Sequence, residues 1–154
     1  MRTWFLVLAL GCGGPGPSTP PTTPAPSVAD TNTPEAIGKE FAQAALLDNT
    51  EKAKRLTLTY DELVEMSTNA PTKEEYEQLR DSALKEMSGG GRKVKVTQTA
   101  VVKQQTLPAG DKLKHAVDIA YVQFAIDDDG EVHEVGFPLL FIKVGGTWKW
   151  SPKQ

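Results

Sequence analysis

The sequence predicts an α+β domain in which N-terminal helices pack on a four-stranded antiparallel sheet. Between residues 34 and 87, apolar residues recur at the three- and four-residue spacing of amphipathic helices. Between residues 94 and 151 the spacing changes to two, and the segments become rich in β-branched and aromatic residues. Because every helix precedes every strand, the order is not the alternation that builds a parallel sheet.

The first helix is predicted to begin at Pro34, because Thr33 is a good N-cap and proline is tolerated at the first helical position. Its apolar positions continue to about Leu47. The polar residues 48–50 then interrupt the pattern and can cap a short second helix in which Ala53 and Leu56 face inward.

Two more helices are predicted by capping boxes. Thr59 and Thr72 are each followed three residues later by Glu, the spacing at which hydroxyl and carboxylate both accept a bond from a free backbone amide. The helix after Thr72 ends at the Ser-Gly-Gly-Gly run of residues 88–91. Its apolar residues form one stripe, made by Tyr76, Leu79, Ala83, Leu84 and Met87.

Four strands are expected after residue 91. In the first, Val94, Val96 and Val102 alternate with polar residues and are predicted to face inward. The remaining strands are expected at residues 114–126, 131–144 and 147–151. The sequences Asp-Asp-Asp-Gly at 127–130 and Gly-Gly at 145–146 are typical of the tight turns that join antiparallel strands.

The N-terminus has the pattern of an export signal. One basic residue, Arg2, precedes an apolar run from Trp4 to Leu10, which is too short to span a bilayer. The segment Leu8-Ala-Leu-Gly-Cys12 resembles the lipobox of bacterial lipoproteins. This resemblance implies that residues 1–11 are removed as a signal peptide and that the sulfur of Cys12 is lipidated. An ordinary cleaved signal and a short uncleaved anchor are the alternatives.

Residues 12–33 are predicted to be the lipidated cysteine and a disordered tether, because a stretch of Pro, Thr, Ser, Gly and Ala cannot form a packed core. Residues 34–154 are long enough for one domain. Cys12 is the only cysteine, so this domain has no disulfide of its own. Gly13 after the cysteine, by the sorting rule of enteric lipoproteins, indicates the outer membrane facing the periplasm.

The order of elements and the segment Phe141-Ile-Lys-Val-Gly-Gly-Thr-Trp-Lys-Trp150 resemble the cystatin-like cone of the nuclear transport factor 2-like superfamily. In that fold a curved sheet wraps a long helix, and the resemblance implies a pocket between sheet and helices. Members of the superfamily include enzymes, binding proteins and dimerisation modules. The resemblance therefore implies a fold without choosing a function.

Catalytic relatives such as ketosteroid isomerase place an Asp, Tyr or His inside the cone. The candidates for a polar or pocket-lining role here are Tyr60, His115, Asp118, Tyr121, His133 and Trp148. Asp118 and Tyr121 differ by three places, so they are predicted to point to opposite faces of a regular strand. No catalytic motif of the superfamily aligns with these residues, and we assign none of them a catalytic role.

The sequence indicates neither a metal site nor a cofactor. Asp127–Gly130 begins like a calcium loop, but Gly136 stands where the bidentate Glu belongs, so a hairpin turn fits better. A net charge of −3 argues against binding nucleic acid. Lysines on the first strand (Lys93, Lys95 and Lys103) are expected on a solvated face, which either protects the sheet from aggregation or contacts an anionic partner.

We therefore expect an envelope lipoprotein, attached to the membrane by lipid on Cys12, with a non-catalytic binding or interaction module. Three hypotheses stay open at this point. The module binds a small apolar ligand, it contacts an envelope protein or a second copy through its outer sheet face, or it is an isomerase- or dehydratase-like enzyme with a polar group inside the cone.

Overall fold

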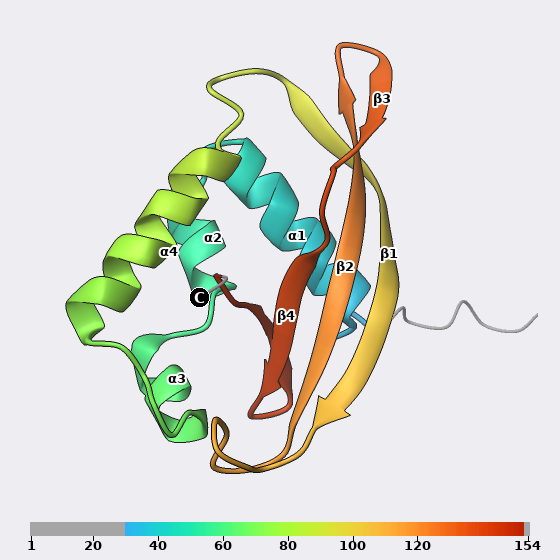
Figure 1. Cartoon of the computed structure of the whole chain (residues 1–154). Coiled ribbons are helices and arrows are strands. Elements are labelled where there is room, and N and C mark those ends of the chain that lie inside the picture. The colour runs from blue at the N-terminus through green and yellow to red at the C-terminus, as the bar shows by residue number, and fades with distance from the viewer. Residues whose placement is uncertain (1–29, 153–154) are drawn as a thin grey trace, which may run out of the picture.

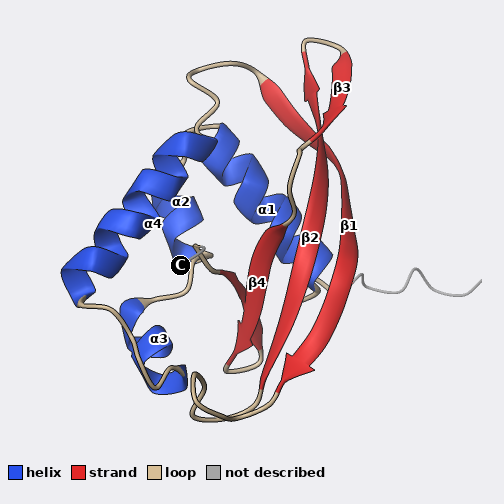
Figure 2. Cartoon of the chain, viewed as in Figure 1, coloured by secondary structure: helices blue, strands red, loops and turns tan. Residues whose placement is uncertain are grey.

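The computed structural model describes residues 30–152, so the predicted signal peptide, Cys12 and the tether up to residue 29 lie outside the described residues. Helices come first and an antiparallel sheet follows, which confirms the predicted α+β class (Figures 1 and 2). Within this part of the chain the elements are α1 (Pro34–Leu46), α2 (Thr50–Arg55), α3 (Tyr60–Met66), α4 (Lys73–Met87), β1 (Val94–Leu107), β2 (Val117–Asp128), β3 (Glu131–Glu134), β4 (Leu139–Val144) and β5 (Thr147–Trp150).

Each helix begins at a side chain that satisfies a free backbone amide. Thr33 caps α1 as predicted, and among residues 48–50 it is Asn49 that caps α2. The predicted capping boxes at Thr59 and Thr72 are both complete, and in each the Glu three residues later accepts a bond from the backbone amide of the Thr, at 2.8 and 2.9 Å. The helix starts are therefore set by local hydrogen bonding.

The strands are arranged in the order β1-β2-β4-β5, and β3 pairs with the end of β2 beyond β4. The expected strand at 131–144 is thus two strands, and the described sheet has five strands instead of four. Residues 135–138 interrupt it, since Gly136 favours a bend and Pro138 has no N–H to donate to a ladder. Both predicted tight turns are confirmed, because Asp129, Gly130, Gly145 and Gly146 all have positive φ.

Two register shifts, at 96–98 and 101–103, bend the long strand β1. Val94 and Val96 are buried as predicted, at 4% and 0% exposure, but Val102 is 57% exposed. The prediction for Val102 is wrong because it is the unpaired residue of the second bulge, and a bulge breaks the alternation of faces. The predicted exposure of Lys93, Lys95 and Lys103 is confirmed.

The main core lies between α1 and the sheet face that α1 covers, at the back in Figure 1. Phe41 is fully buried at its centre, stacks on Trp150 with ring centroids 4.5 Å apart and meets Phe141 edge-on at 6.0 Å. Gly38 allows α1 to lie this close to β2, because a Cβ at this position would lie only 3.1 Å from a methyl group of Val122. The aromatic residues of the C-terminal segment are therefore core residues.

A second, smaller core forms on the opposite face, where α3 packs on the lower part of β2. Its buried members are Leu58, Met66, Val117 and Ile119. Residues 56–58 also continue the sheet, since the amide of Leu58 donates to the carbonyl of Trp150 and the amide of Trp150 to that of Leu56, each at 2.8 Å. Tyr76 of α4 donates its hydroxyl to the Leu58 carbonyl and holds α4 beside this strand.

Candidate functional site

The predicted site residues do not come together in one pocket. Tyr60 is half-buried and donates its hydroxyl to the carbonyl of Pro71 at 3.1 Å. Asp118, on β2, accepts a bond from the Thr106 hydroxyl at 2.7 Å. Tyr121 packs with the smaller core on the other face of β2, so the prediction that Asp118 and Tyr121 point to opposite faces is confirmed.

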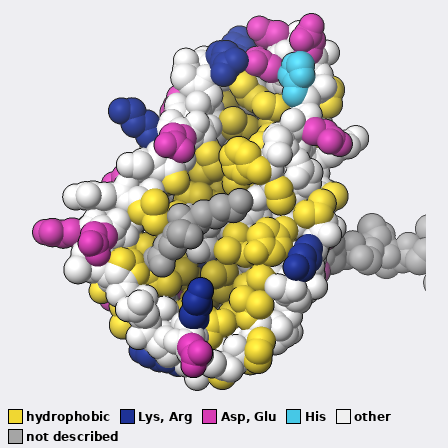
Figure 3. Space-filling model, viewed as in Figure 1, with side chains coloured by type: hydrophobic (Ala, Val, Ile, Leu, Met, Phe, Trp, Pro, Cys, Tyr) yellow, Lys and Arg dark blue, Asp and Glu magenta, His cyan; other side chains and the backbone are white. Residues whose placement is uncertain are grey.

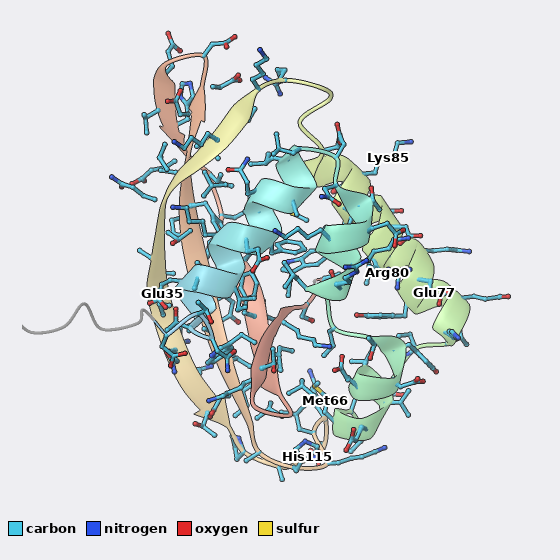
Figure 4. All side chains as sticks on the ribbon, turned by 180° about the vertical axis from the view of Figure 1, so that it is seen from behind. Glu35, Met66, Glu77, Arg80, Lys85 and His115 are labelled. Atoms are coloured by element: carbon cyan, nitrogen blue, oxygen red, sulfur yellow. The ribbon has the colours of Figure 1, made fainter. Side chains whose placement is uncertain are left out.

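The histidines lie at opposite ends of the sheet. His133 is exposed on β3, with its Nε2 3.5 Å from the carboxylate of Glu131. His115 lies near Met66 at the lower end of the molecule (Figure 4). Trp148 is 4% exposed within the main core, and the Lys143 ammonium lies 5.8 Å from its ring centroid. Trp148 is thus a core aromatic covered by one cation.

A polar hollow of about 670 Å³ separates α3 from the ends of β2 and β4, and it does bring His115 and Asp118 to one place. Its carboxylates Glu62 and Asp118 already accept hydrogen bonds from neighbouring side chains. Partial burial raises the pKa of Glu62, but the hydrogen bond from Lys149, at 2.7 Å, and those from Thr59 outweigh burial and hold that pKa below its usual range. A carboxylate held ionised in this way is poorly suited to proton transfer near neutral pH.

An apolar cleft lies between α4 and residues 135–140. It consists of two adjoining hollows, of about 310 and 290 Å³, which share the side chains of Glu86, Met87, Phe137 and Leu139. Figure 3 shows hydrophobic side chains gathered over the face between α4 and the sheet, where this cleft opens. Its further apolar lining is Ala42, Ala45, Leu46, Leu79, Ala83, Val94, Phe124, Ile126, Val135, Leu140 and Trp150.

The floor of the cleft depends on a close approach between two helix ends. The amide of Gly89 donates to the Leu46 carbonyl at 3.1 Å, which holds the end of α4 against the end of α1. A Cβ on Gly89 would lie 2.4 Å from that same oxygen, so no other residue fits without a backbone shift. At the upper mouth, Arg92 pairs with Asp128 at 3.0 Å and donates to the Gly89 carbonyl at 3.2 Å.

This arrangement is better suited to binding an apolar group than to catalysing a reaction. Protein sites for small molecules have mostly apolar walls with a few polar groups that fix orientation. Here the walls are aliphatic and aromatic, and the charged groups Glu86, Arg92 and Asp128 lie at the rim. Sequence reasoning placed Leu79, Ala83 and Met87 on the inner stripe of α4, but it missed Phe137 and Leu139, which enter the cleft because residues 135–138 leave the sheet.

The chain matches no protein-family model, and neither a curated protein nor a solved structure is significantly similar to it. Among the helices of residues 30–152, none is both long enough and apolar enough to cross a bilayer.

Proposed function

We propose that this chain is a lipid-anchored envelope protein whose domain, a cone of the nuclear transport factor 2-like kind, is a non-catalytic binding module for a small apolar ligand. The apolar cleft carries this proposal. It offers two adjoining hollows of a size that a small molecule or part of a lipid fills. Partly exposed Met87 and Leu140 and the more exposed Phe137 would lose contact with water when the cleft is filled.

The free energy for such binding would come from the burial of apolar surface. Each 100 Å² of apolar surface removed from water contributes about 2.5 kcal/mol. An apolar ligand also leaves the rim pair of Arg92 and Asp128 intact, so no buried charge is left unpaired. The charged groups of the cleft lie at its rim and not among its apolar walls, which favours the binding hypothesis over an isomerase-like enzyme.

Lipid anchoring is proposed from the sequence. The Leu8–Cys12 segment supports attachment of acyl chains to Cys12, and two or more chains give stable membrane binding where a single chain is marginal. The proline-rich residues 13–33 would then separate the domain from the outer membrane, on its periplasmic side.

Native mass spectrometry tests the ligand proposal. Residues 30–154 are exported behind a cleavable signal peptide and isolated without denaturation from the periplasm of an expressing bacterium, and we expect extra mass that is lost on denaturation. Met87→Trp fills the part of the cleft that both hollows share and should abolish the extra mass. Leu47→Trp is the matched control, because Leu47 is 53% exposed and does not line the cleft. Equal extra mass in the two variants, or none in the parent, contradicts the proposal.

Membrane fractionation tests the anchor. The full chain should sediment with the outer membrane, and Cys12→Ala should release it into the periplasm or leave the signal uncleaved. If the Cys12→Ala chain is cleaved and stays membrane-bound like the parent, the lipid-anchor proposal is wrong.

A further inference from the structure

Strand β1 forms one edge of the sheet. It is 14 residues long and pairs with β2 along one side, while its other side meets no strand within residues 30–152. An unpaired edge presents backbone N–H and C=O groups that can bind another strand, and proteins guard such edges with charges, bulges or covering side chains.

The beginning of this edge is guarded by α1. The side-chain amide of Gln43 takes the place of a neighbouring strand, since its Nε2 donates to the Val94 carbonyl at 3.0 Å and its Oε1 accepts from the Val96 amide at 2.8 Å. Lys93 and Lys95 flank the same stretch and add the charges typical of a protected edge.

The rest of the edge, residues 98–106, is built differently. It carries one charged residue, Lys103, and no proline or glycine. The bulge at Val102 exposes 57% of a β-branched apolar residue. A bulge by itself disfavours pairing at an edge, but the residue that this bulge exposes is valine, whose β-branched side chain favours pairing.

We propose that residues 98–106 of β1 pair antiparallel with the same residues of a second copy, about a two-fold axis at Val102. In this register Val102 lies opposite its own copy, Ala100 opposite Gln104, and Lys103 opposite Val101. No like charges lie directly opposite each other, and the two exposed valines cover one another. The interface is isologous and joins the two sheets into one.

The proposed anchor makes such a small interface effective. Strand pairing along one edge buries little surface, so the dimer is weak in dilute solution. Two chains held by lipid in one membrane have a much higher effective concentration. The pairing does not depend on what fills the apolar cleft. It rests on the proposed function only in one respect, because the lipid anchor supplies the high effective concentration.

Disulfide trapping of the full chain in bacterial membranes tests the proposal. Residues directly opposite in an antiparallel pair have Cα atoms about 4.5–5.5 Å apart, within the range that a disulfide bridges. Under a mild oxidant, Val102→Cys should shift the chain to twice the monomer mass on a non-reducing gel. Val132→Cys is the matched control, because Val132 is a 62% exposed strand valine on β3 and should stay monomeric.

A second pair of variants tests the register. Ala100→Cys and Gln104→Cys chains expressed together should form a mixed dimer that neither forms alone. If Val102→Cys crosslinks no more than Val132→Cys, or if Ala100→Cys alone crosslinks as well as the mixture, the proposal is overturned. Fractionation of the same cells shows whether the chains are membrane-bound, which separates a failure of anchoring from a failure of pairing.

Discussion

Removing the hydroxyl of Tyr76 should destabilise the domain and remove part of its sensitivity to alkali. Tyr76 is 1% exposed and donates to the carbonyl of Leu58, which is itself buried. Tyr76→Phe keeps the ring in place and leaves that carbonyl without this donor. The expected cost is about 1–3 kcal/mol of unfolding free energy, the penalty for a buried polar group that loses its partner.

The pH dependence follows from the same burial. Burial raises the pKa of Tyr76 from 10.0 to about 12. The unfolded chain releases this proton near pH 10 and the folded chain keeps it to about pH 12. The stabilisation is therefore fully present below pH 10 and is lost as the pH rises toward 12. This difference in pKa corresponds to about 3 kcal/mol at most.

Urea unfolding followed by tryptophan fluorescence measures both effects, because Trp148 and Trp150 are buried. At neutral pH Tyr76→Phe should be less stable than the parent. Above about pH 10 the parent should lose stability faster than Tyr76→Phe, so the difference between their unfolding free energies should shrink. Tyr60→Phe is the control, because it removes a half-buried tyrosine hydroxyl that donates to the carbonyl of Pro71 at 3.1 Å. A gap between parent and Tyr76→Phe that stays constant from about pH 8 to about pH 11 would refute the reasoning.

Gly89→Ala should cost about 1–3 kcal/mol by overpacking against a carbonyl at the end of α1, whereas Gly110→Ala, where a Cβ meets nothing within 4 Å, should leave the thermal melt unchanged. Burial raises the pKa of Glu62, but Lys149 and Thr59 hold it below its usual range, so the ionised carboxylate stabilises the fold above the pKa of the unfolded carboxyl. This stabilisation is lost as the pH falls through the folded pKa. Glu62→Gln should therefore reduce the loss of stability at acid pH, and an unchanged loss in urea titrations would count against the Glu62–Lys149 pair. Thr72→Ala should lower the urea midpoint by the equivalent of about 1 kcal/mol through loss of the α4 cap, so an unchanged midpoint would speak against the capping box.

Sequence reasoning predicted those features that depend on neighbouring residues. The caps at Thr59 and Thr72 join groups three residues apart, so their spacing alone carries the information. The bulge at Val102 depends on how β1 aligns with β2, which alternation within one strand does not reveal. The break at residues 135–138 had a local signal in Gly136 and Pro138, which the expected single strand at 131–144 overlooked.

The candidate site was less predictable for a physical reason. An apolar residue on the inner stripe of a helix has the same sequence pattern whether it contacts core or an open cleft. Met87 and Leu84 both belong to the predicted stripe, yet Leu84 is 7% exposed in the main core and Met87 lines the apolar cleft. The difference arises from the position of residues 135–140, which the pattern of α4 does not encode.

The pairing of β5 with residues 56–58 has a consequence for how the chain folds. Trp150 closes the sheet on Leu58 and stacks on Phe41, so the main core is incomplete until the last strand is in place. Contacts between residues so distant in sequence slow folding, because the intervening chain must be ordered before they form. A nascent chain would thus lack its complete core until Trp150 is available, and the export proposed above requires a chain that has not yet folded.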